Sequence, residues 1–179
     1  MRSSEPPQYT GAASGILELT MTVPGAIGVI KELGRTHPDR VIGAGTVLTV
    51  GSAGACLEAG AEFLTSPNLD LEIVDFAERR CVMLIPGVLS PTEVMLSRKD
   101  GADFVKVFPC SAVGGQNYIR ALKAPFPDVR FIASGGVNRH TAGDFIRAGA
   151  SALGIREGLI PAKAILGREL DLRTASSPS

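Results

Sequence analysis

The sequence predicts an α/β protein built on a parallel sheet, and three observations support this prediction. Short apolar runs alternate with segments of helical pattern along most of the 179 residues. Many of these runs are apolar on both faces, as strands of a parallel sheet covered by helices should be. A Gly-Ala pair also recurs at Gly60, Gly101 and Gly149, each time where a helical pattern ends and a strand begins. The units are about 20 to 25 residues long, which fits a (β/α) barrel and a doubly wound sheet equally.

Seven strands are expected, because seven short runs are bounded by Gly or Pro and are too short to form independent helices. In order they cover residues 16–21, 41–47, 62–67, 81–86, 104–109, 130–134 and 151–155. The other segments predict helices at residues 24–33, 52–59, 69–79, 91–98, 116–123, 141–148 and 162–167. Pro24 stands near the start of the first helix, and Ser90 followed by Pro91 is a typical start for the fourth. Residues 1–14 and 170–179 are expected to be irregular ends of one domain that spans residues 1–179.

Composition and charge exclude several classes of protein. Eighteen basic residues balance 18 acidic ones, so no net charge predicts a nucleic-acid or anionic-membrane partner. The three cysteines show no metal-binding or disulfide pattern, and the two histidines lie too far apart in the sequence to form a zinc motif. No apolar run is long enough to span a bilayer, and residues 1–15 lack the apolar centre of a signal peptide. The sequence therefore predicts a soluble cytoplasmic protein without a metal site.

Two ionisable side chains stand inside apolar strands, where a charge is costly to bury. Lys106 lies in the run Phe-Val-Lys-Val-Phe-Pro, and burial favours the neutral amine, a nucleophile that forms Schiff bases with carbonyl groups. The alternative is a lysine on an edge strand that points to water. Glu18 lies in Ile-Leu-Glu-Leu-Thr-Met, where a buried carboxyl group can move protons near neutral pH; the alternative is a structural pair with an arginine. If both are buried on separate strands of a barrel, they can meet across its axis.

The carboxyl ends of the predicted strands carry polar and Gly-rich sequences, and in a barrel these ends form the active-site face. Ser134, Gly135 and Gly136 offer unhindered backbone N–H groups before a helix, which predicts a site for a phosphate or carboxylate group. Arg156, after the last strand, is a candidate charged partner for that anion. Cys110 is expected to be a small packing residue.

Six motifs occur in order between Gly15 and Ala164. They are Glu18-Leu-Thr, Gly43-Ala-Gly-Thr-Val, Ser66-Pro, Ile85-Pro-Gly, Phe104-Val-Lys-Val-Phe-Pro and Ser134-Gly-Gly-Val. Together they resemble the 2-keto-3-deoxy-6-phosphogluconate (KDPG) and 4-hydroxy-2-oxoglutarate (KHG) aldolase family. The resemblance implies a class I aldolase on a TIM barrel, usually a homotrimer, that needs no metal or other cofactor. It also implies that Lys106 is the Schiff-base lysine and that Glu18 is the general acid and base.

The resemblance implies roles for the strand ends as well. Thr46 and Pro67 match positions at the pyruvyl end of the site, and Phe108 stands beside the lysine. The turn at residues 134–136 matches the phosphate loop of the family. The implied substrate is then a 2-keto sugar acid or its phosphate, and pyruvate is one product.

The chain departs from the family pattern at several positions. The family's first strand and helix, which normally contribute an arginine to the site, have no counterpart, and the final helix is short. The strands at 16–21 and 151–155 are then expected to have unpaired edges. Thr22 stands where some members have Arg, and Arg156 and Glu157 stand where Gly and Gly or Ser are usual.

Four functions remain open on the sequence. The first is cleavage of KDPG to pyruvate and glyceraldehyde 3-phosphate, of KHG to pyruvate and glyoxylate, or of both. The second is the same chemistry on the galactonate epimer of KDPG. The third is a truncated, inactive relative that acts as a binding protein or a subunit, and the fourth is another phosphate-binding barrel, such as an isomerase or a synthase. Lys106 and Glu18 favour an aldolase, whereas the missing first unit favours the inactive relative.

Overall fold

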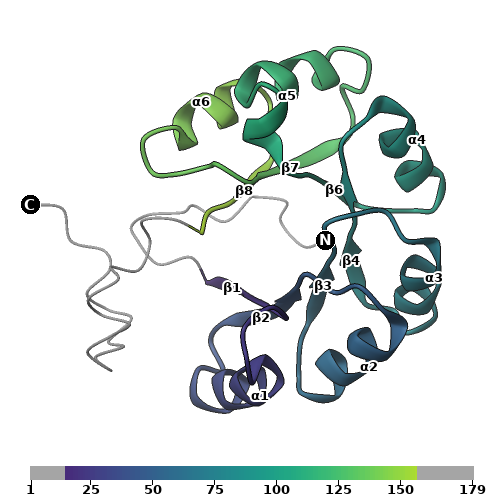
Figure 1. The fold of residues 1–179 in the computed structure, drawn as a ribbon, viewed down its shortest axis with the longest axis vertical. Helices are drawn as coiled ribbons and strands as arrows, with labels where there is room; N and C mark the ends of the chain where they lie inside the picture. The colour runs from purple at the N-terminus through teal and green to yellow at the C-terminus, as the bar shows by residue number, and fades with distance from the viewer. Residues whose placement is uncertain (1–14, 157–179) are drawn as a thin grey trace, which may run out of the picture.

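The computed structural model describes residues 15–156, in which strands and helices alternate as the sequence predicts (Figure 1). Its strands are β1 (Ile16–Thr20), β2 (Val41–Gly45), β3 (Phe63–Thr65), β4 (Met83–Ile85), β5 (Gly87–Val88), β6 (Phe104–Val107), β7 (Arg130–Ser134) and β8 (Ala152–Gly154). Its α-helices are α1 (Ala26–Thr36), α2 (Val50–Glu58), α3 (Leu71–Arg79), α4 (Pro91–Lys99), α5 (Gln116–Lys123) and α6 (Ala142–Arg147), and a short 3₁₀ helix, η1, covers Cys110–Val113. The expected helix at 162–167 and the expected irregular ends at 1–14 and 170–179 lie outside the described residues.

All strand pairs within the described residues are parallel, and they form two sheets in the orders β1-β2-β3-β4 and β5-β6-β7-β8. β4 and β5 are consecutive parts of one extended segment, interrupted at Pro86, which has no N–H to donate to a ladder. The Pro86 carbonyl still accepts the N–H of Lys106 at 2.9 Å, so this segment joins the two sheets. The run predicted at 81–86 therefore extends to Val88.

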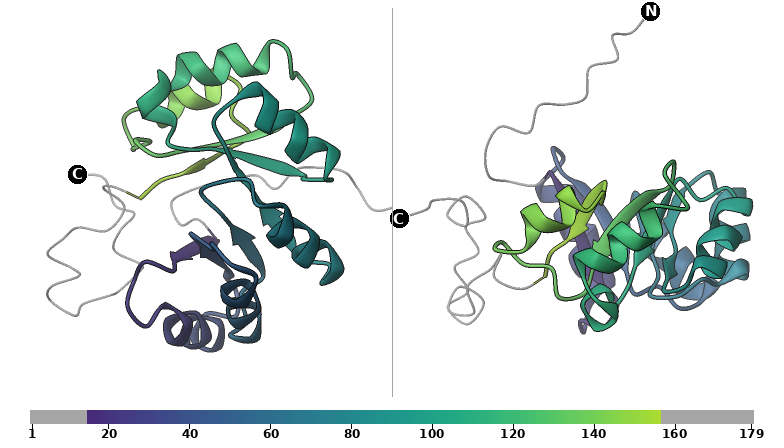
Figure 2. Two further views of the ribbon diagram at one scale, coloured as in Figure 1. Left: turned by 45° about the vertical axis from the view of Figure 1, so that its right-hand side comes forward. Right: turned by 90° about the horizontal axis from the view of Figure 1, so that it is seen from above.

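The helices lie on one side of the strands. Figure 1 shows the strands around a common centre with α1 to α6 outside them, and Figure 2 shows the helices on the outer side of each sheet. This is the arrangement of a (β/α) barrel, because a doubly wound sheet carries helices on both faces. Within residues 15–156 no strand pairing joins β1 to β8, so these are the outer strands of the described sheets.

In the described part of the chain, two apolar cores lie between the strands and the helices. The core of the β1–β4 half includes Ile42 and Leu64, and the core of the β5–β8 half includes Val105 and Phe131. All four side chains are at most 1% exposed. Burial of such a side chain stabilises the fold by about 1.5–3 kcal/mol, so the two cores hold the strands, and the side chains at their ends, in place.

Side-chain caps set the starts of three helices. Thr49 caps α2 in a capping box, Asp70 caps α3 and Ser90 caps α4. With these caps, α2 begins at residue 50, where residue 52 was predicted, and α3 begins at residue 71, where residue 69 was predicted. The predicted start after Ser90 is confirmed.

The described helices are short. The longest of them, α1, has 11 residues, whereas a bilayer requires about 20 apolar ones. None of the helices within residues 15–156 combines the length and the apolar character needed to cross a membrane.

Candidate active site

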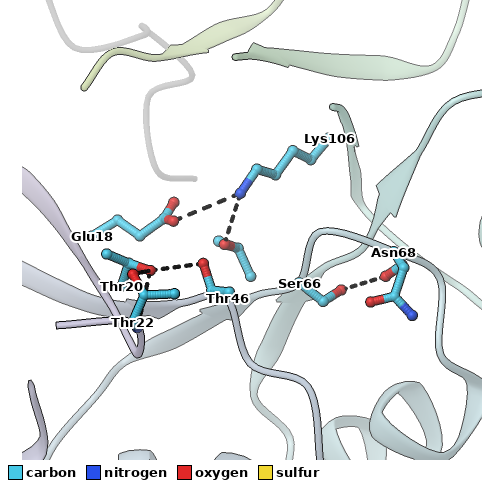
Figure 3. Close-up of polar contacts among 8 residues, drawn as sticks. Glu18, Thr20, Thr22, Thr46, Ser66, Asn68 and Lys106 are labelled. Atoms are coloured by element: carbon cyan, nitrogen blue, oxygen red, sulfur yellow. Dashed lines mark hydrogen bonds and ion pairs between the residues drawn. The ribbon is translucent and has the colours of Figure 1, made fainter. Parts of the chain in front are cut away.

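Lys106 lies at the centre of the candidate site. It is the third residue of β6, which pairs with β5 on one side and with β7 on the other, and it is 7% exposed. Its Nζ donates a hydrogen bond to Oγ1 of Thr65 at 3.2 Å and lies 3.7 Å from Oε1 of Glu18 (Figure 3). The alternative of an edge lysine that points to water is excluded, because β6 is a central strand and its lysine is buried.

Glu18 reaches the lysine from β1, on the other sheet. The expectation that Glu18 is buried is wrong, since its side chain is 36% exposed. β1 is the outer strand of its described sheet, so no described strand covers Glu18 on one side. The carboxylate lies against β2, where a Cβ on Gly45 would be 2.0 Å from Oε1. Its ion-pair partner is Lys106 and not an arginine, so the amine and the carboxylate meet across the interior, as predicted.

Three threonine hydroxyl groups form a hydrogen-bonded group at the carboxyl ends of β1 and β2 (Figure 3). Thr20, at the end of β1, donates a hydrogen bond to Oγ1 of Thr46 at 2.7 Å and shares another with Thr22 at 3.0 Å. Thr46 follows β2 with a φ of 58°, a conformation that is rare for a β-branched residue and is typical of functional sites. Thr46, which is predicted to lie at the pyruvyl end of the site, is therefore hydrogen-bonded to β1, the strand that carries Glu18.

Pro67 and Phe108 both lie close to the lysine strand. The Nζ atom of Lys106 is 5.3 Å from the centre of the Phe108 ring. Pro67 follows β3, and its backbone packs so closely against Gly87 that a Cβ there would lie 2.2 Å from the Pro67 carbonyl carbon. Because Gly87 is the register partner of Lys106, this contact places the end of β3 beside the lysine strand.

The predicted anion-binding turn lies at the carboxyl end of β7. Ser134 is the last residue of β7, and Gly135 and Gly136 have φ values of 84° and 79°, which glycine adopts without strain. A Cβ on Gly135 would lie 3.2 Å from the Phe108 ring, so the turn is adjacent to the ring that contacts the lysine.

Arg156 is exposed and lies two residues beyond β8. Since Gly154 of β8 pairs with Ser134 of β7, Arg156 follows the same end of the sheet as the turn. Within residues 15–156, no hydrogen bond or ion pair joins Arg156 to the turn or to Lys106. Glu157, its predicted acidic neighbour, lies outside the described residues.

Thr65 is a site residue that the sequence did not predict. It is 2% exposed, ends β3 and accepts the hydrogen bond of the Lys106 amine. The available signal was a lone hydroxyl group in the apolar strand Phe-Leu-Thr. Threonine is common in strands, so this signal alone does not point to a functional role.

The chemistry available at the site is that of an amine, a carboxylate and hydroxyl groups. An amine can add to a carbonyl carbon, and a carboxylate 3.7 Å away can take or return a proton. Cys110, which follows β6, is buried as expected, and burial raises the pKa of its thiol to about 11, so this thiol is not a nucleophile at neutral pH. In the part of the chain that the structure describes, no group of three or more His, Cys, Asp or Glu side chains is placed to hold a metal ion.

Comparison with known proteins places this geometry in a family. The family model described as KDPG and KHG aldolase matches residues 9–174. A 2-dehydro-3-deoxy-phosphogluconate aldolase of Pseudomonas aeruginosa is 37% identical over 137 residues, which cover 75% of this chain and 62% of that protein. A KHG/KDPG aldolase of Escherichia coli K12 is 31% identical over 156 residues, which cover 87% of this chain and 73% of that protein. The chain thus spans less than two thirds of the length of the Pseudomonas relative.

Solved structures show the same fold. A KDPG aldolase of Legionella pneumophila, with pyruvate captured as a covalent carbinolamine intermediate, matches with a TM-score of 0.82 at 33% identity, over 88% of this chain and 77% of that one. The chain has the TIM-barrel fold of these aldolases, although closure between β1 and β8 is not seen within residues 15–156. Because the family model covers residues 9–174 and the fold agrees, the chain belongs to the KDPG and KHG aldolase family.

Proposed function

We propose that the chain is a class I aldolase that cleaves KDPG to pyruvate and glyceraldehyde 3-phosphate, KHG to pyruvate and glyoxylate, or both. The observation that carries this proposal is the buried amine of Lys106, which lies 3.7 Å from the carboxylate of Glu18. Relatives named for KDPG, and for KHG and KDPG together, support it. The proximity of these two reactive groups argues against an inactive relative.

The proposed reaction begins at Lys106. Its amine adds to the C2 ketone of the substrate, and loss of water leaves a protonated imine that withdraws electrons from the C3–C4 bond. The Glu18 carboxylate takes the C4 hydroxyl proton, the C3–C4 bond breaks, and its electron pair passes into the imine to give the enamine of pyruvate. The aldehyde leaves, Glu18 returns the proton to C3, and water hydrolyses the imine to release pyruvate and restore the amine.

The strand ends account for substrate binding in this proposal. Thr46 and Pro67 line the pyruvyl end, and Phe108 covers the imine. Both substrates carry an anionic group at the end far from the ketone, a phosphate in KDPG and a carboxylate in KHG. The turn at 134–136 binds this group through its backbone N–H groups, and Arg156 adds a positive charge. The galactonate epimer of KDPG carries the same groups, so a panel of the three substrates is needed to rank them.

The proposal extends to the assembly and location of the enzyme. The family resemblance implies a single barrel domain that acts as a homotrimer in the cytoplasm. A formal net charge of zero supports a small-molecule substrate over a nucleic-acid or membrane partner. The three cysteines are free thiols, which fits a reducing compartment.

Borohydride trapping with pyruvate tests the imine. Borohydride reduces an imine to a stable amine, so intact-mass measurement then detects a pyruvyl adduct on the protein. We expect the adduct on the parent protein and none on Lys106→Ala. Lys31→Ala is the matched control, because Lys31 is exposed on α1 and its removal leaves the adduct in place. A folded parent protein without an adduct overturns the class I mechanism and favours the inactive relative.

Glu18→Gln separates imine formation from bond cleavage in the same experiment. This variant keeps Lys106, so we expect it to form the adduct with pyruvate. Release of pyruvate from KDPG should fall by about 100-fold or more, because the C4 hydroxyl proton has lost its acceptor. Undiminished cleavage by Glu18→Gln would remove Glu18 from its proposed role and leave that of Lys106 intact.

A further inference from the structure

A threonine at the end of β3 contacts the amine on which the proposed reaction depends. We propose that Thr65 is a positioning residue that holds Nζ of Lys106 in the orientation from which the amine adds to the substrate ketone. This inference rests on the proposed function, since it concerns the imine-forming step. It is carried by a separate observation, the hydrogen bond from Nζ to Oγ1 of Thr65 at 3.2 Å between two buried side chains.

Thr65 itself is held rigidly. Its carbonyl accepts a hydrogen bond from the N–H of Val47, which follows the neighbouring strand β2, at 3.0 Å. On the opposite edge of β3, Thr65 pairs with Ile85 of β4. Its side chain is 2% exposed, and the branched β-carbon restricts it to few rotamers. The hydroxyl oxygen therefore has a fixed position in the interior.

Lys106, in contrast, carries its amine on a flexible four-carbon chain. Glu18 does not fix the amine, because its Oε1 lies at 3.7 Å, beyond hydrogen-bond distance, and its side chain is 36% exposed. Among the described residues, Thr65 provides the one acceptor within hydrogen-bond distance of Nζ. Thr65 therefore locates the amine, and Glu18 lies on another side of it.

The direction of the hydrogen bond decides where the nucleophilic lone pair can point. Because Nζ donates a hydrogen to Thr65, the lone pair of the neutral amine occupies a different corner of the nitrogen tetrahedron. A carbonyl carbon that approaches from the Glu18 side can then meet the lone pair. Without the hydroxyl group the amine rotates more freely, and a smaller share of its orientations is reactive.

Two substitutions of Thr65 distinguish orientation from packing. Valine keeps the shape and removes the hydroxyl group, whereas serine keeps the hydroxyl group and removes a methyl group. The measurements are the initial rate of the trapped pyruvyl adduct at saturating pyruvate, the half-saturating pyruvate concentration, and urea unfolding. We expect Thr65→Val to form the trapped pyruvyl adduct at least about tenfold more slowly than the parent protein. Its half-saturating pyruvate concentration should change by less than about threefold. Thr65→Ser should stay within about threefold of the parent rate.

A packing role predicts the opposite order, because serine leaves a cavity that valine fills. A slow Thr65→Ser beside a normal Thr65→Val therefore overturns the inference, and so does a Thr65→Val variant that traps at the parent rate. If Thr65→Val shows no native unfolding transition, Thr65→Ala replaces it in the comparison with Thr65→Ser, since these two differ only by the hydroxyl oxygen. Failure of the proposed function is distinguishable, because the parent protein then gives no adduct and both proposals are overturned together.

Discussion

Gly45 lies where the carboxylate of Glu18 comes closest to the backbone of β2. A Cβ at this position would be 2.0 Å from Oε1 of Glu18, so Gly45→Ala must displace the carboxylate from its place near Lys106. We expect pyruvate release from KDPG to fall about tenfold or more, while borohydride trapping of pyruvate persists because the amine and Thr65 are unchanged. A coupled assay for pyruvate and intact-mass detection of the adduct measure the two steps separately.

Gly28→Ala is the control for this substitution, since nothing lies within 4 Å of a Cβ at Gly28 on α1. It should leave both steps unchanged. Equal losses of trapping and cleavage in Gly45→Ala would show a general disturbance of the site and contradict a selective displacement of Glu18.

The sequence predicts those residues of the candidate site whose side chains are chemically unusual for their position in a strand. Lys106 and Glu18 are ionisable groups inside apolar strands, and such groups need a physical reason to be there. Thr65 has no such signal, because a threonine fits a strand without any functional role. The exposure of Glu18 could not be predicted either, since it depends on which strands neighbour β1 and not on the residues of β1 itself.

At the scale of the secondary-structure element, α4 begins with a cap that depends on a charge. The Glu93 carboxylate accepts the N–H of Leu89 at 2.8 Å and that of Ser90 at 2.7 Å. The hydrogen bond from Leu89 is the largest cause of a lowered pKa for Glu93, and the hydroxyl and N–H groups of Ser90 add to it against a contribution from burial. The folded state therefore favours the ionised carboxylate.

Glu93→Ala is expected to lower the free energy of unfolding by about 1 kcal/mol at pH 7, a typical cost for a lost cap contact. Because the pKa of Glu93 is depressed in the folded state, its contribution is fully present above the unfolded pKa and is lost as the pH falls through the folded value. The difference between parent and variant should therefore shrink below about pH 4 in urea unfolding. Glu93→Gln, which cannot titrate, is the control, and its stability relative to Glu93→Ala should not change with pH. A parent-to-variant difference that is constant with pH contradicts the role of the charge.

Element types could be predicted better than element boundaries. α5 covers residues 116–123 as predicted, since its apolar pattern agrees with the two glycines that precede it and with Pro125 after it. The predicted strand end at Pro86 is too early, because a proline lacks only the N–H group and its carbonyl still accepts the N–H of Lys106. A strand can therefore continue past a proline when the neighbouring strand donates an N–H to the proline carbonyl and does not require an N–H from the proline.

At the scale of the whole molecule, residues 15–156 form two half-sheets with separate cores, joined by the segment that contains β4 and β5. The alternation of strands and helices could not decide between a barrel and a doubly wound sheet, since both show it. The choice depends on long-range contacts, in which Lys106 and Glu18 from the two halves meet in one interior. The proposed chemistry therefore requires both halves to be correctly placed.

Gly87→Ala tests the junction between the halves. A Cβ on Gly87 would lie 2.2 Å from the carbonyl carbon of Pro67, which is backbone and cannot rotate away. We expect the free energy of unfolding to fall by about 1–3 kcal/mol, as for an overpacked core, and trapping to slow because Gly87 pairs with Lys106. Urea unfolding and adduct formation are the measurements.

Gly54→Ala on α2 is the matched control, because its Cβ would meet the Phe76 ring at an ordinary 3.7 Å. Its stability should be unchanged, or higher by up to about 1 kcal/mol, since alanine is the better helix former. A Gly87→Ala protein as stable as the parent would contradict the close approach of β5 to the end of β3.

Cys81 differs from the other two thiols in its position. It is exposed and precedes β4 at the amino end of the sheet, whereas the proposed site lies at the carboxyl ends of the strands. Cys56 and Cys110 are buried, and burial raises the pKa of both thiols. A maleimide reagent would therefore attach at one place in the folded protein. Molecules tethered through Cys81 to a solid support would all present the carboxyl-end face to the solution, as an oriented surface for carbon–carbon bond synthesis.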